Sequence, residues 1–308
     1  MAAPIAPPDR ARADGPVIAV IGDAALDLSF EVASFDGVDE KVEATSSLEL
    51  GGTGANAAAA IVQLGGQARL HAVVARDSIG DFILRQLIDR GLDTADMAIV
   101  DGRSTVAVIL RSRERRLVIV DRGVADKVSH IDPAVVADGA AVVYLSAVPW
   151  AVAANVIAKS TVPVVVGLEA RQLADLGAGG TPQAVAQVLD RAHVVLTNEA
   201  GAGALAEIIR QLATATVVVT RGAAGAMLRV HGGPYVEVHA PAIDVVDATG
   251  AGDCFAGALC YFLAGGSRIE SVVRLATIAA SLSTRQRGAQ AGLPGEAEVR
   301  AIFQNQAL

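Results

Sequence analysis

The chain has 308 residues, of which 52% are hydrophobic and only 3% aromatic, and its formal net charge is −8. This length suits one large α/β domain, and the negative charge argues against a general nucleic-acid binder. A nucleotide ligand is not excluded, because a local cluster of backbone N–H groups can bind phosphate without a positive net charge.

The N-terminal region predicts a tail followed by a buried strand. Residues 1–15 are rich in Ala, Pro, Arg and Asp without an apolar core, which indicates a disordered tail and not a secretory signal. Val17 to Ile21 is a continuous apolar run, typical of a buried strand. Asp27 follows soon after, where open α/β sheets bind ligands beyond a strand's carboxyl end. A plain turn residue is the alternative, and Asp23 is a second candidate for the same role.

Two segments have the pattern of half-exposed strands. Residues 31–50 are polar with several β-favouring residues, and residues 104–120 alternate apolar and charged side chains. Together they predict a small β lid over a site. Because such a sheet has a face without a partner, we expect the lids of two subunits to pair in a homodimer.

A Gly-rich segment lies between the two predicted lid segments. Gly51 and Gly52 are followed by Asn56 and by a helix-forming run from Ala57 to Leu64. Paired glycines let the backbone approach a ligand closely, and Asn56 can both donate and accept hydrogen bonds. The segment also fits the dinucleotide pattern G-x-G-x-x-A, but that motif should follow a buried apolar strand. Here the half-polar residues 46–50 precede it, which argues against a dinucleotide site.

The second half of the chain alternates predicted strands and helices. Before it, Leu70 to Ala75 predicts a buried strand, and Asp77 is interpreted as the N-cap of a helix that reaches Arg90. The uncharged stretch 140–158 contains Pro149 and is interpreted as a strand and a helix, not as a membrane span. The alternation indicates a parallel sheet with right-handed crossovers. Its predicted strands are Val142–Leu145, Val162–Val166, Val194–Leu196 and Val217–Thr220.

The stretch from Val245 to Phe255 joins a polar turn to an apolar helix. Gly250 and Gly252 therefore lie at a helix N-terminus, where the first N–H groups lack intrahelical partners and an anion is favoured. Asp253 would compete with that anion unless it takes a proton from a hydroxyl while the N–H groups hold a transferring phosphoryl group. The alternative is a first-turn carboxylate that only stabilises its helix.

The sequence Asp-Ala-Thr-Gly-Ala-Gly-Asp at 247–253 closely resembles the C-terminal signature of the ribokinase-like (PfkB) carbohydrate kinases. Weaker motifs extend the resemblance over residues 16–305. It implies an α/β fold, a three-layer αβα sandwich with a mostly parallel central sheet and a small β lid, in a single kinase domain over 16–308. The implied activity is transfer of phosphate from ATP, with Mg²⁺, to a hydroxyl of a small sugar.

The resemblance also implies roles for individual residues. Asp253 would be the catalytic base, and the backbone of Gly250, Ala251 and Gly252 would form the anion hole. The substrate would contact Asp27, Gly51, Gly52 and Asn56. The nucleotide would contact Asn198, Thr220, Gly222 and Gly225, although Asn198 also suits a helix N-cap.

This chain departs from the family pattern in its substrate and metal motifs. The family's Asp-Pro-Asn-x-Arg reads Gly167-Leu168-Glu169-Ala170-Arg171 here. The acceptor therefore stays open between a sugar, at a primary hydroxyl, and a nucleoside of the adenosine, cytidine or pseudouridine type. Gly201 replaces the Glu of the family's Asn-x-x-Glu motif, for which Glu199 is a candidate substitute. A ligand-binding protein with weak or no catalysis on the same scaffold is the more remote alternative.

The last two expectations concern a monovalent cation site and the cellular location of the protein. In relatives a monovalent cation such as K⁺ binds beside the anion hole, and Asp247 would be its strongest ligand, with Thr249 contributing a backbone oxygen. Gly292 replaces the usual Ser of that site. Cys254 and Cys260 lie on one predicted helix and cannot readily form a disulfide, which favours a reducing, cytoplasmic location.

Overall fold

The computed structural model describes most of the chain. The described ranges are 15–35, 41–113, 115–130, 132, 136–177 and 180–305. The expected disordered tail lies outside them except for Gly15.

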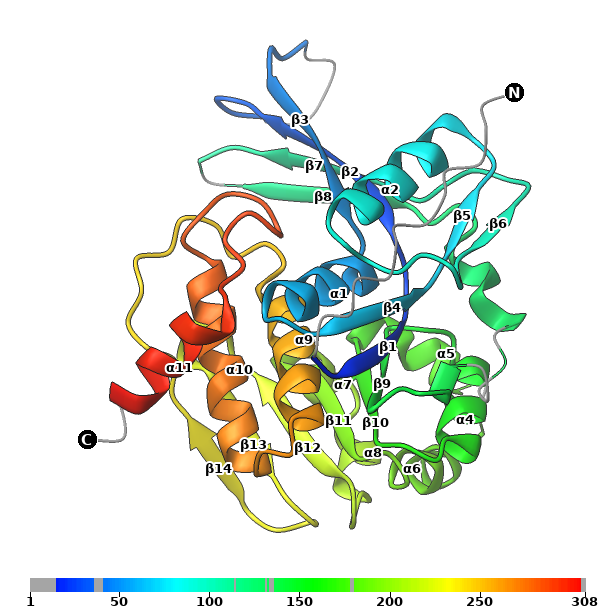
Figure 1. Ribbon diagram of the computed structural model, residues 1–308, viewed down its shortest axis with the longest axis vertical. Helices are drawn as coiled ribbons and strands as arrows, with labels where there is room; N and C mark the ends of the chain where they lie inside the picture. Colours follow the sequence, from blue (N-terminus) through cyan, green and yellow to red (C-terminus); the bar gives the residue numbers. More distant parts are fainter. Residues whose placement is uncertain are drawn as a thin grey trace.

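An eight-stranded sheet forms the centre of the molecule (Figure 1), in the order β14-β13-β12-β11-β10-β9-β1-β4. The neighbours from β4 to β12 are parallel, and the last two strands form an antiparallel edge. The predicted parallel sheet is therefore confirmed. Its strands are β1 (Val17–Ile21), β4 (Gln67–His71), β9 (Val142–Ser146), β10 (Val164–Leu168), β11 (Val194–Asn198), β12 (Thr216–Thr220), β13 (Ala226–Arg229) and β14 (Tyr235–Val238).

Helices cover both faces of this sheet, because its strands are apolar on both sides. In β1, Ile18 and Val20 belong to one core, and Ala19 and Ile21 belong to the other. The first core is covered by α1 (Thr53–Gln63), α2 (Ser78–Asp89), α9 (Ala251–Ala264), α10 (Ile269–Ser283) and α11 (Glu296–Asn305). The second is covered by α4 (Trp150–Lys159), α5 (Leu173–Gly177), α6 (Pro182–Leu189), α7 (Glu199–Ala204) and α8 (Ala206–Arg210). The described residues also include the 3-10 helices η1 (Ala125–His130), η2 (Ala170–Gln172) and η3 (Gly222–Ala224).

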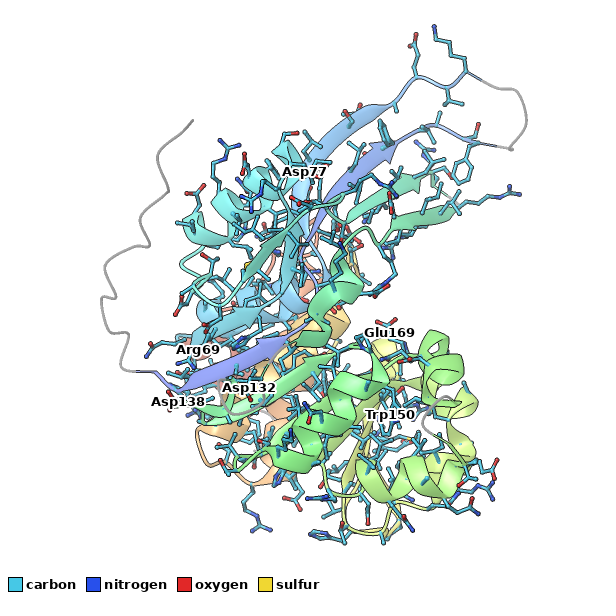
Figure 2. The ribbon with its side chains drawn as sticks, turned by 90° about the vertical axis from the view of Figure 1, so that its right-hand side faces the viewer. Arg69, Asp77, Asp132, Asp138, Trp150 and Glu169 are labelled. Carbon is cyan, nitrogen blue, oxygen red and sulfur yellow. The ribbon has the colours of Figure 1, made fainter. Side chains whose placement is uncertain are left out.

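A second, four-stranded sheet rises from the main body (Figures 1 and 2), in the order β3-β2-β7-β8. Its strands are β3 (Thr45–Gly51), β2 (Ala25–Glu31), β7 (Val106–Arg111) and β8 (Arg116–Asp121), and a separate pair joins β5 (Val73–Ala75) to β6 (Ala98–Val100). The segments expected to form a lid contribute β3, β7 and β8. The interpretation of Asp27 as a turn residue is wrong, because it lies inside β2. The alternation of Leu26, Leu28 and Phe30 with polar residues is the strand signal that identifies β2.

Three local expectations can be compared with the structure. Asp77 is the N-cap of α2, as predicted, since its Oδ1 accepts a hydrogen bond of 2.7 Å from the Gly80 N–H. Cys254 and Cys260 are free and buried in α9. Among the residues that the structure describes, no helix is both long and apolar enough to cross a bilayer.

Candidate active site

The turn before α9 creates the start of the site. Gly250 is the N-cap of this helix and has φ = 74°, a left-handed conformation that favours glycine. The Ala251 N–H donates to the Ala248 carbonyl at 3.2 Å, which closes the turn. The first-turn N–H groups of Gly252 and Asp253 have no intrahelical acceptor by position. Of the three N–H groups predicted to form the anion hole, that of Ala251 is therefore engaged in the turn.

Asp253 is oriented by a chain of amide side chains. Asn56 Nδ2 donates to Asp253 Oδ2 at 2.8 Å, and Gln290 Nε2 donates to Asn56 Oδ1, also at 2.8 Å. Asn56 is 6% exposed, so its amide has little freedom to turn. Helix α1 and the loop after α10 therefore hold the carboxylate that α9 presents.

The surroundings of Asp253 favour its protonated form. Burial raises the pKa of Asp253 to about 8, and the nearby charges of Asp23, Glu169 and Asp27 act in the same direction. The hydrogen bond from Asn56 opposes them. A carboxylate with a pKa near neutrality is a stronger base than an ordinary Asp, which suits the removal of a proton from a hydroxyl.

A cavity of about 390 Å³ lies between Asp253 and the small sheet, and we call it the acceptor cavity. Asp27, Gly52 and Asn56 line it, as do Gly250 and Asp253. Gly51 is not part of its lining but makes room for it, because a Cβ there would overlap the Asp27 carboxylate. The other lining residues are Asp23, Ala25, Thr53, Thr105, Ala107, Ile109, Arg116, Val118, Val120, Arg122, Glu169 and Thr249.

Asp27 and Asp23, which the sequence offered as alternatives, have different roles. Asp23 Oδ1 accepts hydrogen bonds from Thr53 Oγ1 (3.0 Å) and from the Gly54 N–H (3.2 Å) at the start of α1. It therefore holds the Gly-rich segment against the end of β1. Burial raises the pKa of Asp27 to about 6, and the charges of Glu49 and Asp23 add to this effect. The Asp27 carboxyl group also lines the acceptor cavity, and its substrate-binding role stays a prediction.

A second cavity, of about 530 Å³, lies on the other side of the α9 N-terminus, and we call it the nucleotide cavity. Thr220, Gly222 and Gly225, three of the four residues expected to bind nucleotide, line it together with Gly252. Most of the remaining lining is apolar: Ala223, Ala240, Pro241, Ala242, Ile243, Val245, Ala248, Ala251, Phe255, Thr277, Ala280, Ser281 and Thr284.

A small polar cavity of about 140 Å³ also borders the start of α9. Glu169, Asn198, Gly252 and Asp253 contribute to its lining. It shares Asp253 with the acceptor cavity and Gly252 with the nucleotide cavity. The α9 N-terminus therefore stands where all three spaces meet, and Figure 2 shows Glu169 at the edge of the main body nearest the small sheet.

Asn198 matches the family's Asn-x-x-Glu motif, whereas Gly201 replaces the Glu of that motif. Asn198 Oδ1 accepts from the Gly201 N–H at 2.8 Å, so this side chain caps α7 while also lining the small cavity. A Cβ at Gly201 would overlap the Thr197 hydroxyl, so a Glu there needs a local rearrangement. Glu199 is not a substitute for it in this structure, because Glu199 is exposed and pairs with Arg221 at 3.3 Å.

Comparisons with known proteins identify the family of this chain. The family model described as "pfkB family carbohydrate kinase" matches residues 16–296. The chain belongs to this family of carbohydrate kinases. It is 30% identical over 307 residues to the ribokinase of Bacillus subtilis, covering 93% of this chain and 99% of that one.

Solved structures show the same fold. A nucleoside kinase of Burkholderia thailandensis in complex with inosine has a TM-score of 0.77 at 22% identity, with 94% of this chain and 97% of that chain covered. The ribokinase of Arabidopsis thaliana complexed with ribose and ATP has a TM-score of 0.74 at 22% identity, with 94% and 99% covered. The ribokinase-like fold is therefore confirmed for this kinase. The dinucleotide alternative is wrong, because its segment follows β3 of the small sheet and lies against the acceptor cavity.

The expected cation site of this kinase does not fit a metal ion. Asp247 Oδ1 accepts from the Thr249 N–H (3.0 Å) and Thr249 Oγ1 (2.7 Å). Asp247 Oδ2 accepts from Arg111 Nη1 (2.6 Å) and from the Gly288 N–H (3.0 Å). A carboxylate has about four lone-pair sites, and four donors already fill them. These contacts disagree with the prediction of Asp247 as a cation ligand, because the positive charge beside its Oδ2 comes from Arg111.

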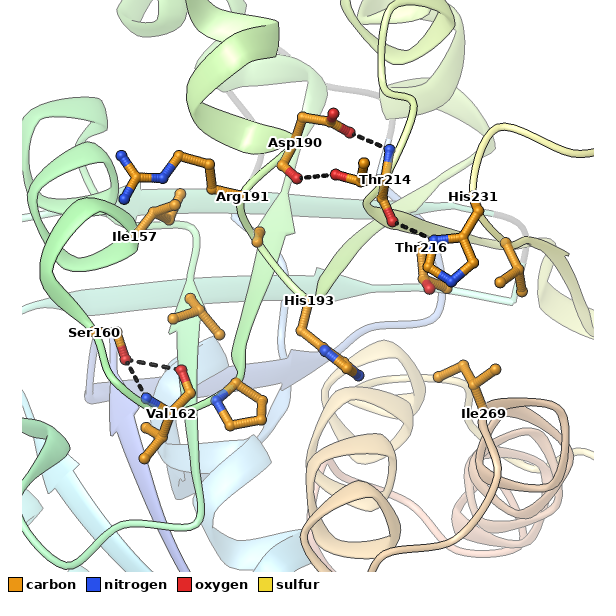
Figure 3. A pocket seen from close by; sticks show the side chains of 14 residues that line it. Ile157, Ser160, Val162, Asp190, Arg191, His193, Thr214, Thr216, His231 and Ile269 are labelled. Atoms are coloured by element: carbon orange, nitrogen blue, oxygen red, sulfur yellow. Dashed lines mark hydrogen bonds between the residues drawn. The ribbon is translucent and has the colours of Figure 1, made fainter.

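Another hollow lies away from this site (Figure 3). Its volume is about 630 Å³, and it opens at the amino ends of β10, β11 and β12, whereas the acceptor and nucleotide cavities lie at the carboxyl ends. His231 belongs to it and bonds the Thr214 carbonyl at 3.0 Å through Nδ1. Asp190 is committed to the backbone N–H groups of residues 213–215. We assign this hollow no part in catalysis.

Two site residues were missed by the sequence analysis. Gln290 orients Asn56 from 234 positions away, and Arg111 contacts Asp247 from 136 positions away. Gln290 lies in a loop without a repeating pattern. Arg111 ends an alternating strand, where a basic residue usually faces water. No local signal distinguishes either residue from a solvated side chain.

Proposed function

We propose that this kinase transfers the γ-phosphoryl group of ATP to a primary hydroxyl of a small sugar. The observation that supports the proposal most strongly is the position of Asp253. It lines the acceptor cavity and lies one residue after Gly252, which lines the nucleotide cavity. A hydroxyl beside Asp253 and a phosphate beside Gly252 would therefore face each other across the start of one helix.

The chemistry assigns a separate task to each part of the site. The ionised Asp253 accepts the proton of the attacking hydroxyl, and its raised pKa makes it a stronger base than an ordinary Asp. The N–H groups at the start of α9 stabilise the charge on the transferred group. Asp27 and Asn56 orient the acceptor. Phosphoryl transfer depends mainly on positioning and electrostatics, so these groups account for the catalysis proposed.

The small polar cavity fits Mg²⁺ with ATP. Mg²⁺ prefers oxygen ligands and is usually bound through one or two carboxylates together with phosphate oxygens and waters. Glu169 offers a carboxylate at this cavity, and Asn198 offers an amide beside it. These two residues would hold the ion, which would neutralise phosphate charge when bound.

A sugar is favoured over a nucleoside by the lining of the acceptor cavity. Nucleobases are commonly held by stacking on aromatic rings. None of the described residues that line the acceptor cavity is aromatic. Three carboxylates, from Asp23, Asp27 and Glu169, lie around it beside Asp253, and carboxylates are suitable acceptors for several sugar hydroxyls.

We also propose a homodimer formed through the small sheet. The edge strand β8 is exposed along its whole length, with Leu117 at 46% and Ile119 at 57%. Apolar side chains on an edge strand favour pairing with another strand. Sedimentation of the wild type and of Ile119→Lys should show a dimer and a monomer, respectively. A wild type that sediments as a monomer at high concentration would contradict the pairing.

A panel of acceptors tests the proposed function. Transfer of ³²P from γ-labelled ATP should be measured with pentoses, hexoses and nucleosides, and the product's phosphate position assigned by NMR. We expect transfer to the terminal hydroxyl of one or a few small sugars. Transfer to nucleosides alone would establish the nucleoside kinase instead, and ATP binding without transfer to any acceptor would contradict both.

A further inference from the structure

Arg111 links the small sheet to the turn that precedes α9. It is the last residue of β7, and its guanidinium reaches two residues of that turn: Nη1 donates to Asp247 Oδ2 at 2.6 Å, and Nη2 donates to Thr249 Oγ1 at 2.7 Å. The Arg111 and Asp247 side chains are 21% and 9% exposed, so water screens the pair only in part. The contact is well shielded and directional.

The electrostatic consequence concerns the anion hole. Asp247 is three residues before Gly250, and an uncompensated carboxylate at this place would repel a phosphoryl group arriving at Gly252. Arg111 supplies one positive charge beside Asp247 Oδ2. One guanidinium therefore contacts both the Asp247 carboxylate and the Thr249 hydroxyl that donates to that carboxylate.

We propose that the Arg111 guanidinium is a built-in cation behind the anion hole, so that phosphoryl transfer by this kinase needs no monovalent metal ion. The inference rests on the proposed function. Arg111 is a positioning residue, since it acts through Asp247 and Thr249 and not on the substrate. Because Arg111 belongs to β7 of the small sheet, its charge lies beside Asp247 only when that sheet packs against the turn before α9.

A second ion pair between the same regions provides a matched control. Arg287, in the loop after α10, pairs with Glu31 at the end of β2. Their side chains are 70% and 49% exposed, and an ion pair with such exposure contributes little. Arg287→Ala removes a link between the small sheet and the main body without removing the charge beside Asp247.

The experiment compares salts at one ionic strength. Initial rates with saturating Mg-ATP and acceptor should be measured in KCl, NaCl and tetramethylammonium chloride, whose cation is too large and weakly coordinating for a carboxylate site. We expect the wild type to vary by less than about twofold among the salts, since its fixed charge is already present. A rate at least about tenfold higher in KCl would overturn the proposal.

The Arg111 variants test whether Arg111 is the reason why the rate does not depend on the salt. Arg111→Lys and Arg287→Ala should retain the salt independence. Arg111→Ala should lose turnover by about ten- to a hundredfold in tetramethylammonium chloride and regain part of it with K⁺ or with millimolar guanidinium. Undiminished turnover of Arg111→Ala, or a loss that neither cation restores, would overturn the proposal, because a purely structural role predicts no rescue.

A melting measurement separates this inference from the proposed function, because it needs no acceptor. The wild type should melt at the same temperature in KCl and in tetramethylammonium chloride, to within about 1 °C, whereas Arg111→Ala should be stabilised by K⁺ alone by about 2 °C or more. Failure to transfer phosphate to the sugar in any salt would contradict the proposed function only. K⁺-specific stabilisation of the wild type, or its absence in Arg111→Ala, would contradict the role of Arg111 only.

Discussion

The acceptor cavity and the nucleotide cavity are built in different ways. The acceptor cavity takes its chemistry from charged and amide side chains, such as Asp27, Asn56 and Asp253, that come from distant parts of the chain. The nucleotide cavity consists mainly of small apolar residues and of glycines in turns. The comparison indicates that acceptor recognition depends on individual polar groups, whereas nucleotide binding depends on shape and backbone.

The largest effect is expected from a change at Asp253, which should lower turnover without weakening ATP binding. Asp253→Asn keeps the shape of the residue but removes the base, so kcat should fall by about 10²- to 10⁴-fold. ATP affinity, measured by calorimetry, should change by less than about threefold, because the nucleotide cavity is untouched. Near-normal turnover would refute the assignment of Asp253 as the base.

Asp253→Asn should lower turnover but raise the stability of the fold. Because the folded-state pKa of Asp253 is raised to about 8, the folded state binds more protons than the unfolded state between about pH 4 and pH 8. Ionisation of Asp253 therefore destabilises the fold increasingly as pH rises through this range. Asp253→Asn should melt about 2–6 °C above the wild type at pH 9 and show little difference at pH 4. This result would also exclude misfolding as the cause of lost turnover.

A bulky side chain in the nucleotide cavity should have the converse effect, weakening ATP binding and leaving acceptor binding unchanged. Ala280 of α10 lines that cavity, and Ala280→Phe would occupy part of its volume. We expect the KM for ATP to rise by about tenfold or more, with the affinity for the acceptor sugar unchanged. Ala301→Phe, on the exposed side of α11, is the control. Unchanged ATP affinity in Ala280→Phe would mean that ATP binds elsewhere.

A smaller effect is expected from the residue that orients Asn56. Gln290→Leu removes the hydrogen bond to Asn56, and a neutral hydrogen bond contributes about 0.5–1.5 kcal/mol. Turnover should fall by about 2- to 12-fold, while the KM for ATP stays constant. Gln286→Leu, an exposed residue in the same loop, should have no effect. Equal losses in both variants would indicate a disturbed loop instead of a misplaced Asn56.

The smallest effect concerns pH. The wild-type kcat/KM for the acceptor should rise with pH up to about 8, as Asp253 loses its proton. Asp23 raises this pKa, and Asp23→Asn removes the charge while keeping an oxygen for Thr53 and Gly54. The acidic limb should therefore move to lower pH by about half a unit. The exposed Asp89→Asn is the control, and a shift to higher pH would contradict the charge arrangement.

The sequence by itself determined the architecture and the centre of the site. Continuous apolar runs such as Val17–Ile21 predicted buried parallel strands, because only strands covered on both faces tolerate them. The pattern at 247–253 predicted a helix start that binds an anion, since turn glycines and first-turn N–H groups are local properties. Both signals lie within a few consecutive residues, so no knowledge of packing was needed.

Only the tertiary structure decided which distant residues complete the site. The strand position of Asp27, its separation in role from Asp23, and the contacts of Gln290 and Arg111 all depend on elements that meet through packing. Arg111 meets Asp247 because β7 of the small sheet ends beside the turn before α9. A basic residue at the end of a strand has the same local sequence pattern whether it faces water or a buried carboxylate. The pairing of Asp247 with Arg111 could therefore be recognised only in the fold.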